Sequence, residues 1–79
     1  MINPDQIKSW IQENLSCEHV EVGGDGRHFE AVIVSPAFRG KSRVQQHQLV
    51  YAALGGRMGA EIHALSMKTF TPEDWAVQG

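Results

Sequence analysis

The sequence predicts one α+β domain, a sandwich in which helices cover one face of a three-stranded mixed sheet. Its 79 residues suit a single domain. Hydrophobic periodicity and turn signals order the predicted elements as helix, strand, strand, helix, strand, helix. A short turn joins the first two strands, which makes them antiparallel, whereas the long helical segment before the last strand allows that strand to join in a parallel sense. Helices packed on one face of such a sheet form an α+β architecture.

The first helix is predicted over residues 4–15. Asn3 can cap the free amide groups, Pro4 suits the first helical position, and Gln6 lies three residues after the cap. The apolar residues that follow at helical spacing form one stripe, namely Ile7, Trp10, Ile11 and Leu15.

A β-hairpin is predicted next. Residues 17–22 alternate in character and indicate a short edge strand. Residues 23–26, Gly-Gly-Asp-Gly, carry a strong hairpin signal. Residues 29–34, Phe-Glu-Ala-Val-Ile-Val, favour a pleated surface with a buried face and form the second strand.

The connection to the last strand contains the longest predicted helix. Pro36 ends the second strand because it has no N–H to donate, and an extra helical turn is predicted at residues 36–38. Ser42 caps a helix that ends at Leu54 or continues to Met58. One apolar stripe is expected along this helix, formed by Val44, His47, Val50, Tyr51 and Leu54. Within that stripe, His47 is expected to be buried and hydrogen-bonded.

The third strand is predicted over residues 61–70. His63 stands at its beginning and is expected to share a face with Leu65 and Met67, because side chains repeat every second residue in a strand.

A final helix is predicted to start after this strand. Thr71 can cap it and Pro72 is its first residue. Trp75, in the next turn, is expected to fold back onto the sheet.

Composition excludes several classes of protein. The net charge is −2, with seven basic and nine acidic residues, which argues against binding nucleic acid by bulk electrostatics. No apolar run is long enough to span a bilayer, and the N-terminus lacks the pattern of a signal peptide. Cys17 is the only cysteine, so it cannot form an internal disulfide, and it is expected to be inert. We therefore expect a cytoplasmic protein without membrane association.

No constellation typical of an enzyme occurs in the sequence. There is no pair of carboxylates around a predicted cleft and no nucleophile motif, and residues 23–26 join two strands without the Lys-Ser/Thr of a phosphate loop. Histidine remains as the chemically informative residue type. His19 and His28 are expected to be solvated, whereas His63 is either a metal ligand or a solvent-exposed side chain. One histidine does not make a metal site, so a metal at His63 needs donors from another molecule or from a second copy of this chain in a homodimer.

A basic cluster precedes the long helix. It consists of Arg39, Lys41 and Arg43. These residues form either a solvated loop or a phosphate-binding site beside a helix N-terminus.

Three segments resemble the BolA-like family, and in particular its short, IbaG-like bacterial branch linked to acid stress. They are residues 40–51 (Gly-Lys-Ser-Arg-Val-Gln-Gln-His-Gln-Leu-Val-Tyr), residues 62–75 (Ile-His-Ala-Leu-Ser-Met-Lys-Thr-Phe-Thr-Pro-Glu-Asp-Trp) and residues 24–29 (Gly-Asp-Gly-Arg-His-Phe). The resemblance implies that residues 1–79 form a single BolA-like domain of order α-β-β-α-α-β-α. This fold is similar to class II KH domains but lacks the GxxG loop that clamps nucleotides.

The resemblance also implies a function as an iron–sulfur cluster partner, in cluster trafficking or sensing. His63 corresponds to the histidine that ligates a 2Fe–2S cluster shared with a monothiol glutaredoxin, whose cysteine supplies donors together with a glutathione thiolate. No cluster is expected in the isolated chain. The family's second ligand lies between the first two strands, where residues 23–27 offer none, so His28 is the nearest donor. The alternative is a DNA-binding transcriptional regulator with a KH-like fold that uses the basic cluster.

Overall fold

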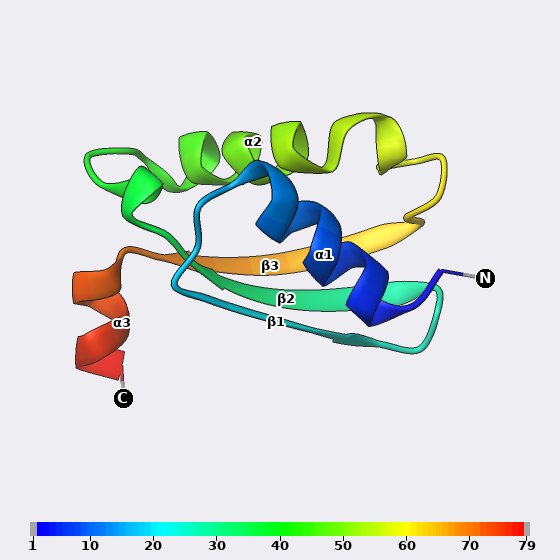
Figure 1. Cartoon of the computed structure of the whole chain (residues 1–79), viewed down its shortest axis with the longest axis horizontal. Coiled ribbons are helices and arrows are strands. Elements are labelled where there is room, and N and C mark those ends of the chain that lie inside the picture. Colours follow the sequence, from blue (N-terminus) through cyan, green and yellow to red (C-terminus); the bar gives the residue numbers. More distant parts are fainter. Residues whose placement is uncertain (1, 79) are drawn as a thin grey trace.

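The predicted order of elements is present in the computed structural model, which describes residues 2–78 (Figure 1). The elements are α1 (Pro4–Asn14), β1 (His19–Gly24), β2 (His28–Val34), the 3-10 turn η1 (Pro36–Phe38), α2 (Arg43–Leu54), the 3-10 turn η2 (Gly55–Arg57), β3 (Ala64–Phe70) and α3 (Pro72–Gln78). The extra turn expected at residues 36–38 is therefore confirmed as η1.

The sheet is mixed, as predicted. Its strand order is β1-β2-β3, with β1 and β2 antiparallel and β2 and β3 parallel. Figure 1 shows α1 and α2 on one face of the sheet, whereas the short α3 lies at the end of the sheet, on the side away from them. The α+β sandwich expected from the sequence is confirmed.

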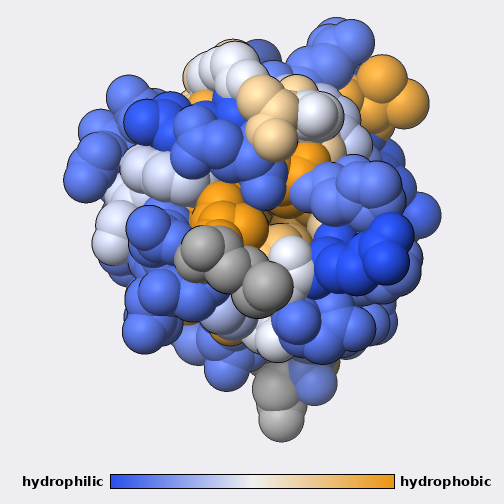
Figure 2. All heavy atoms as spheres, turned by 90° about the vertical axis from the view of Figure 1, so that its right-hand side faces the viewer, coloured by the Kyte–Doolittle hydropathy of each residue, from blue (hydrophilic) through white to orange (hydrophobic). Residues whose placement is uncertain are grey.

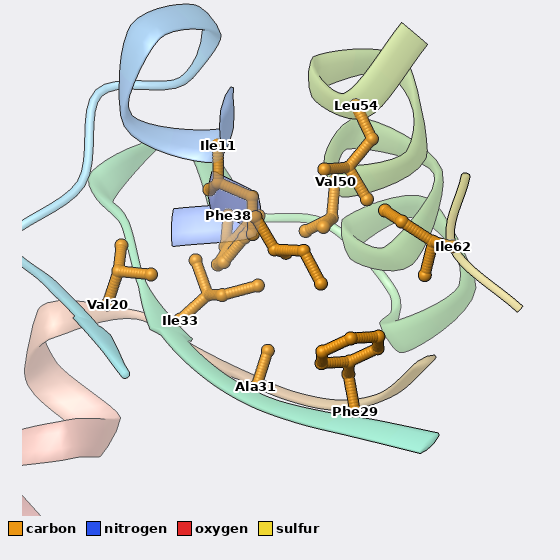
Figure 3. Close-up of a cluster of buried hydrophobic side chains, with 10 residues drawn as sticks. Ile11, Val20, Phe29, Ala31, Ile33, Phe38, Val50, Leu54 and Ile62 are labelled. Carbon is orange, nitrogen blue, oxygen red and sulfur yellow. The ribbon is translucent and has the colours of Figure 1, made fainter. Parts of the chain in front are cut away.

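The core lies between the sheet and the two longer helices (Figure 3). Alternate residues of β2 point towards the helices, because successive side chains of a strand face opposite sides. These residues are Phe29, Ala31 and Ile33, and all three are buried. On the helix side, Ile11 and Val50 are completely buried against them. This packing holds β2 rigidly at the centre of the sheet.

The start of α1 is stabilised by the predicted capping box. The Asn3 side chain accepts the N–H of Gln6 at 3.0 Å, and the Gln6 side chain accepts the N–H of Asn3 at 2.8 Å. The helix ends at Asn14, one residue before the predicted limit. Trp10 is only partly buried, and the Arg57 guanidinium lies 4.2 Å from the centre of its ring. This contact joins α1 to the segment after α2.

The predicted apolar stripe of α2 is wrong in part. Val50 and Leu54 are buried, but Val44 is 67% exposed and Tyr51 is 41% exposed. The inward positions go instead to Ala53 and to a polar residue, Gln46, whose side chain accepts the Thr69 hydroxyl at 2.6 Å. The face of α2 that meets the core and the edge strand is thus the one that carries Gln46, Val50 and Ala53, and the flank carrying Val44 and Tyr51 faces solvent. Because His47 lies on that flank, it is half-exposed, and we find no hydrogen bond to its ring within residues 2–78.

The hairpin differs from its predicted limits. The first strand begins at His19 rather than at residue 17, and it extends through Gly24, so the turn contains only residues 25–27. The first strand extends further than predicted because Gly23 and Gly24 still pair with residues 30 and 29 of β2.

The third strand begins at Ala64, three residues later than predicted. Residues 57–62 form a turn, in which the Arg57 carbonyl accepts the N–H groups of Glu61 at 2.8 Å and Ile62 at 2.9 Å. His63 therefore precedes the strand, and the expectation that it shares a strand face with Leu65 and Met67 is wrong.

Candidate metal centre

His28 and His63 lie side by side at one end of the sheet. Their ring centroids are 6.3 Å apart and the rings are nearly perpendicular, at 77°. His28 begins β2 and pairs with Ala64, the residue after His63, so the parallel arrangement of β2 and β3 places both histidines at the same end. Both side chains are exposed. Figure 2 faces this end of the molecule and shows a largely hydrophilic surface around a small apolar patch.

Each of these histidines is next to a residue that is anchored in the core. Phe29 follows His28 and is 1% exposed, and Ile62 precedes His63 and is 0% exposed. Figure 3 shows Phe29 and Ile62 pointing into the same cluster. Burial of these two side chains fixes the backbone beside each imidazole, and the histidines themselves extend to solvent.

The turn before His63 is braced by hydrogen bonds. Gly59, at φ 83°, donates its N–H to the Ile62 carbonyl at 2.9 Å. The Arg57 guanidinium donates to the Leu54 carbonyl at 3.0 Å while it covers the Trp10 ring. The approach to His63 is thus tied both to the end of α2 and to α1.

The turn before His28 is an Asx turn. One carboxylate oxygen of Asp25 accepts the N–H groups of His28 and Arg27, each at 2.9 Å. These two hydrogen bonds lower the pKa of Asp25, and the bond from His28 has the larger effect. The ionised carboxylate therefore holds the backbone at the start of β2.

The two imidazoles are available for coordination. Within residues 2–78 no hydrogen bond to a side-chain nitrogen of His28 or His63 is present. No group of three or more histidine, cysteine or acidic side chains in this part of the chain is arranged to hold a metal ion. Two donors are fewer than a stable site needs, so this end of the chain can act as part of a shared site only.

Comparison with known proteins places these residues in a family. The family model described as "BolA-like protein" matches residues 9–74. The chain belongs to the BolA-like family. It is 41% identical to the Escherichia coli K12 protein named "Acid stress protein IbaG" over 73 residues, which cover 91% of this chain and 87% of the relative.

Two further matches agree with this assignment. A solved structure of a BolA protein homologue from Coxiella burnetii is 46% identical, with a TM-score of 0.84 over 96% of this chain and 99% of the other. A Haemophilus influenzae protein named "DNA-binding transcriptional regulator BolA" is 42% identical over 66 residues, or 84% of this chain and 64% of the relative. None of these three names denotes an enzyme. No helix within residues 2–78 combines the length and the apolar character needed to cross a bilayer.

Gly24 is essential to the hairpin of this BolA-like protein. Its φ is 154°, and a Cβ at this position would lie 2.8 Å from the Phe29 ring and still closer to the His28 carbonyl. We expect Gly24→Ala to lower the free energy of unfolding by about 1–3 kcal/mol through backbone strain and to displace His28. Urea denaturation measures the first effect, and histidine NMR chemical shifts measure the second.

Gly23→Ala is the matched control. A Cβ on Gly23 meets nothing within 4 Å and the residue has no positive φ, so we expect a change of at most about 0.5 kcal/mol. Equal effects of the two substitutions would contradict the assignment of close packing to Gly24.

His19 lies at the opposite end of the BolA-like domain. Its ring stacks on Trp75 with centroids 5.1 Å apart, and its Nε2 is 3.2 Å from the Glu21 carboxylate. Trp75 also packs on Phe70 at 5.4 Å, so the expectation that it folds back onto the sheet is confirmed. His19 is therefore partly covered by α3, and it is not a free edge-strand histidine.

One of the three side chains in the basic cluster of the BolA-like protein is already held in an ion pair. The Arg39 guanidinium makes a two-pronged ion pair with Glu73, with distances of 2.8 Å and 2.5 Å. This contact lowers the pKa of Glu73 and raises the pKa of Arg39. Lys41 and Arg43 remain exposed, and neither forms an ion pair within residues 2–78. The structure thus leaves two of the three predicted cations available.

Cys17 fits its expected inert role. Its Sγ donates to the Leu15 carbonyl at 3.3 Å, and partial burial raises the pKa of the thiol. A thiol that is harder to deprotonate is a weaker nucleophile and metal ligand.

The sequence argument missed two residues that support the site, Asp25 and Arg57. Asp25 had a readable signal, because an aspartate before a glycine commonly bonds the backbone two or three residues ahead. Arg57 had none, since its contact with Trp10 joins residues distant in sequence.

Proposed function

We propose that this BolA-like protein is an iron–sulfur cluster partner that binds a monothiol glutaredoxin. His63 coordinates a 2Fe–2S cluster bridged between the two proteins, in cluster trafficking or sensing. One observation carries the proposal, namely two exposed imidazoles with free nitrogens whose ring centroids are 6.3 Å apart. A shared metal site takes some of its ligands from each of two proteins. Two histidines are too few to hold a metal alone, so they suit such a site.

The division of ligands follows from the side chains present. His63 would be the first donor and His28 the second, because the two rings are neighbours at the same end of the sheet, with centroids 6.3 Å apart. The glutaredoxin cysteine and a glutathione thiolate supply the remaining donors. A 2Fe–2S cluster supplies one-electron chemistry, and histidine in place of thiolate raises its reduction potential.

Histidine ligation also makes the shared cluster sensitive to acid. An imidazole must be neutral to bind iron, so protons compete with the metal for its nitrogen. Acidification should therefore release the cluster from this protein before it leaves an all-thiolate partner. The name of the relative, an acid stress protein, is consistent with such a response.

The proposal is tested by anaerobic mixing with a cluster-loaded monothiol glutaredoxin. We expect the visible absorption and circular dichroism to change, and iron to elute with both proteins in gel filtration. Separate elution with an unchanged spectrum would refute the partnership. Gel filtration of the isolated protein at several concentrations also shows whether a homodimer supplies the missing donors instead.

A second function, DNA-binding regulation, is favoured by the name of the Haemophilus influenzae relative and by the exposed Lys41 and Arg43. The net charge of −2 and the pairing of Arg39 with Glu73 oppose it. A salt titration separates the two functions. Sequence-independent affinity no tighter than about 10⁻⁴–10⁻⁶ M near physiological salt would be background binding only.

A further inference from the structure

β3 is an outer strand of the sheet, and its free edge carries unpaired backbone groups. The Ser35 N–H donates to the Phe70 carbonyl at 3.1 Å, so Phe70 directs its peptide groups towards β2. Alternate residues of a strand direct their N–H and C=O to opposite edges, which places those of Leu65, Met67 and Thr69 on the free edge. Among residues 2–78 these groups make no hydrogen bond. An edge of this kind is a template for another strand.

A groove runs between this edge and α2. Arg43 and His47 line one side and residues 67–70 line the other, around a hollow of about 210 Å³. Sites for small molecules commonly measure about 300–1,000 Å³, so the hollow is better suited to a short stretch of main chain.

Hydrogen bonds hold the two walls of the groove at a fixed spacing. The Gln46 side chain accepts the Thr69 hydroxyl at 2.6 Å and donates to the Lys41 carbonyl at 3.0 Å. The groove is therefore preformed.

The groove carries a positive charge and has an exposed apolar flank. The side chains of Arg43 and His47 line it without any acidic residue, and Arg43 forms no ion pair within residues 2–78. The Lys68 side chain lies on the opposite face of the sheet, because the neighbouring Thr69 faces α2. Tyr51 lies one turn beyond His47 on the same side of α2, and it is 41% exposed together with Val44 at 67%. A complementary segment would carry acidic and apolar side chains.

We propose that an extended, acidic segment of a partner protein binds in this groove and adds to β3 as a fourth strand. Its main chain would bond the free edge of β3, and a carboxylate of the segment would face Arg43. The groove itself is distinct from the candidate metal centre, because Met67 and Thr69 lie four and six residue steps beyond His63, or about 13 and 20 Å along the strand.

The chemistry of the edge favours a peptide over single-stranded nucleic acid. The edge presents N–H donors and C=O acceptors in alternation, and a peptide strand supplies both, whereas a phosphodiester backbone has no N–H to donate. Phe70, the aromatic residue that lines the groove, is also no free platform for stacking bases, since it is already packed against Trp75.

The test uses a capped synthetic peptide of alternating glutamate and valine, about nine residues long, titrated into the ¹⁵N-labelled protein. We expect chemical-shift changes and at least about tenfold slower amide exchange at Leu65, Met67 and Thr69. Peptides with lysine in place of glutamate, or with N-methylated backbone amides, should not bind.

Charge reversal provides the matched pair of variants. Arg43→Glu should weaken binding about tenfold or more, because it places like charges together in the groove. The substitution suits the fold, since Arg43 is exposed in the first turn of α2, where negative charge is favourable. Arg27→Glu, at the distant and exposed hairpin turn, should leave binding unchanged.

Three results would overturn the proposal. The first is binding of oligothymidylate, and not of the acidic peptide, at the same amides. The second is concentration-dependent protection of these amides without peptide, which would mean that a second copy of this chain occupies the edge. The third is the absence of any change at millimolar peptide.

Discussion

Replacing His63 with alanine is expected to abolish most of the spectral change that a cluster-loaded monothiol glutaredoxin shows on addition of this protein. The substitution removes the exposed imidazole nitrogen that we propose as the first iron ligand. It leaves Ile62 in the core, so the free energy of unfolding should stay within about 0.5 kcal/mol of the wild type. Visible circular dichroism measures the cluster, and urea denaturation measures the fold.

Alanine substitutions of two other histidines provide the comparisons for this result. His47→Ala removes a half-exposed imidazole from α2, away from the candidate centre, and should leave the spectrum as in the wild type. His28→Ala tests the second ligand and should cause a partial loss or a shifted spectrum, because a substitute donor such as water can take its place. A full wild-type signature with His63→Ala would remove the central support for the proposed function.

Replacing Ile62 with alanine is expected to lower the free energy of unfolding by about 2–5 kcal/mol. The side chain is completely buried in the main core cluster, and its removal leaves a cavity beneath the turn that carries His63. Small domains have total stabilities of about 5–15 kcal/mol, so the loss is a large fraction of the whole. Urea denaturation at a fixed temperature measures it.

Val77→Ala and Ile62→Val are the controls for this prediction. Val77 is 84% exposed on α3, so its truncation should change stability by at most about 0.5 kcal/mol. Ile62→Val removes one methyl group and should cost about 0.5–1.5 kcal/mol. If Ile62→Ala were as mild as Val77→Ala, the turn before His63 would not be anchored as described.

The elements that the sequence predicted best depend on short-range interactions. The capping box of α1 joins Asn3 and Gln6, three residues apart, and the same kind of box joins Ser42 and Gln45 at α2. The mixed sheet followed from connection lengths, since a tight turn and a long helical crossover permit few alternatives. These interactions are complete within a few residues and need no knowledge of the rest of the chain.

The predictions that failed depend on contacts between distant segments. The inward face of α2 is decided in part by Gln46 and Thr69, which are 23 residues apart. The late start of β3 follows from the turn at residues 57–62, which Arg57 ties to Trp10 of α1. Periodicity alone cannot reveal such bonds, because it records which residues could be buried and not what they meet.

The sequence by itself determined the order of the elements, the mixed sheet and the importance of His63 through its resemblance to a family. Only the tertiary structure decided that His28 is its neighbour and that Arg39 is paired with Glu73. It also showed that β3 leaves an edge open beside Arg43 of α2. The physical reason is that local propensity selects each helix and strand, whereas the packing of the sheet against α1 and α2 brings distant side chains together.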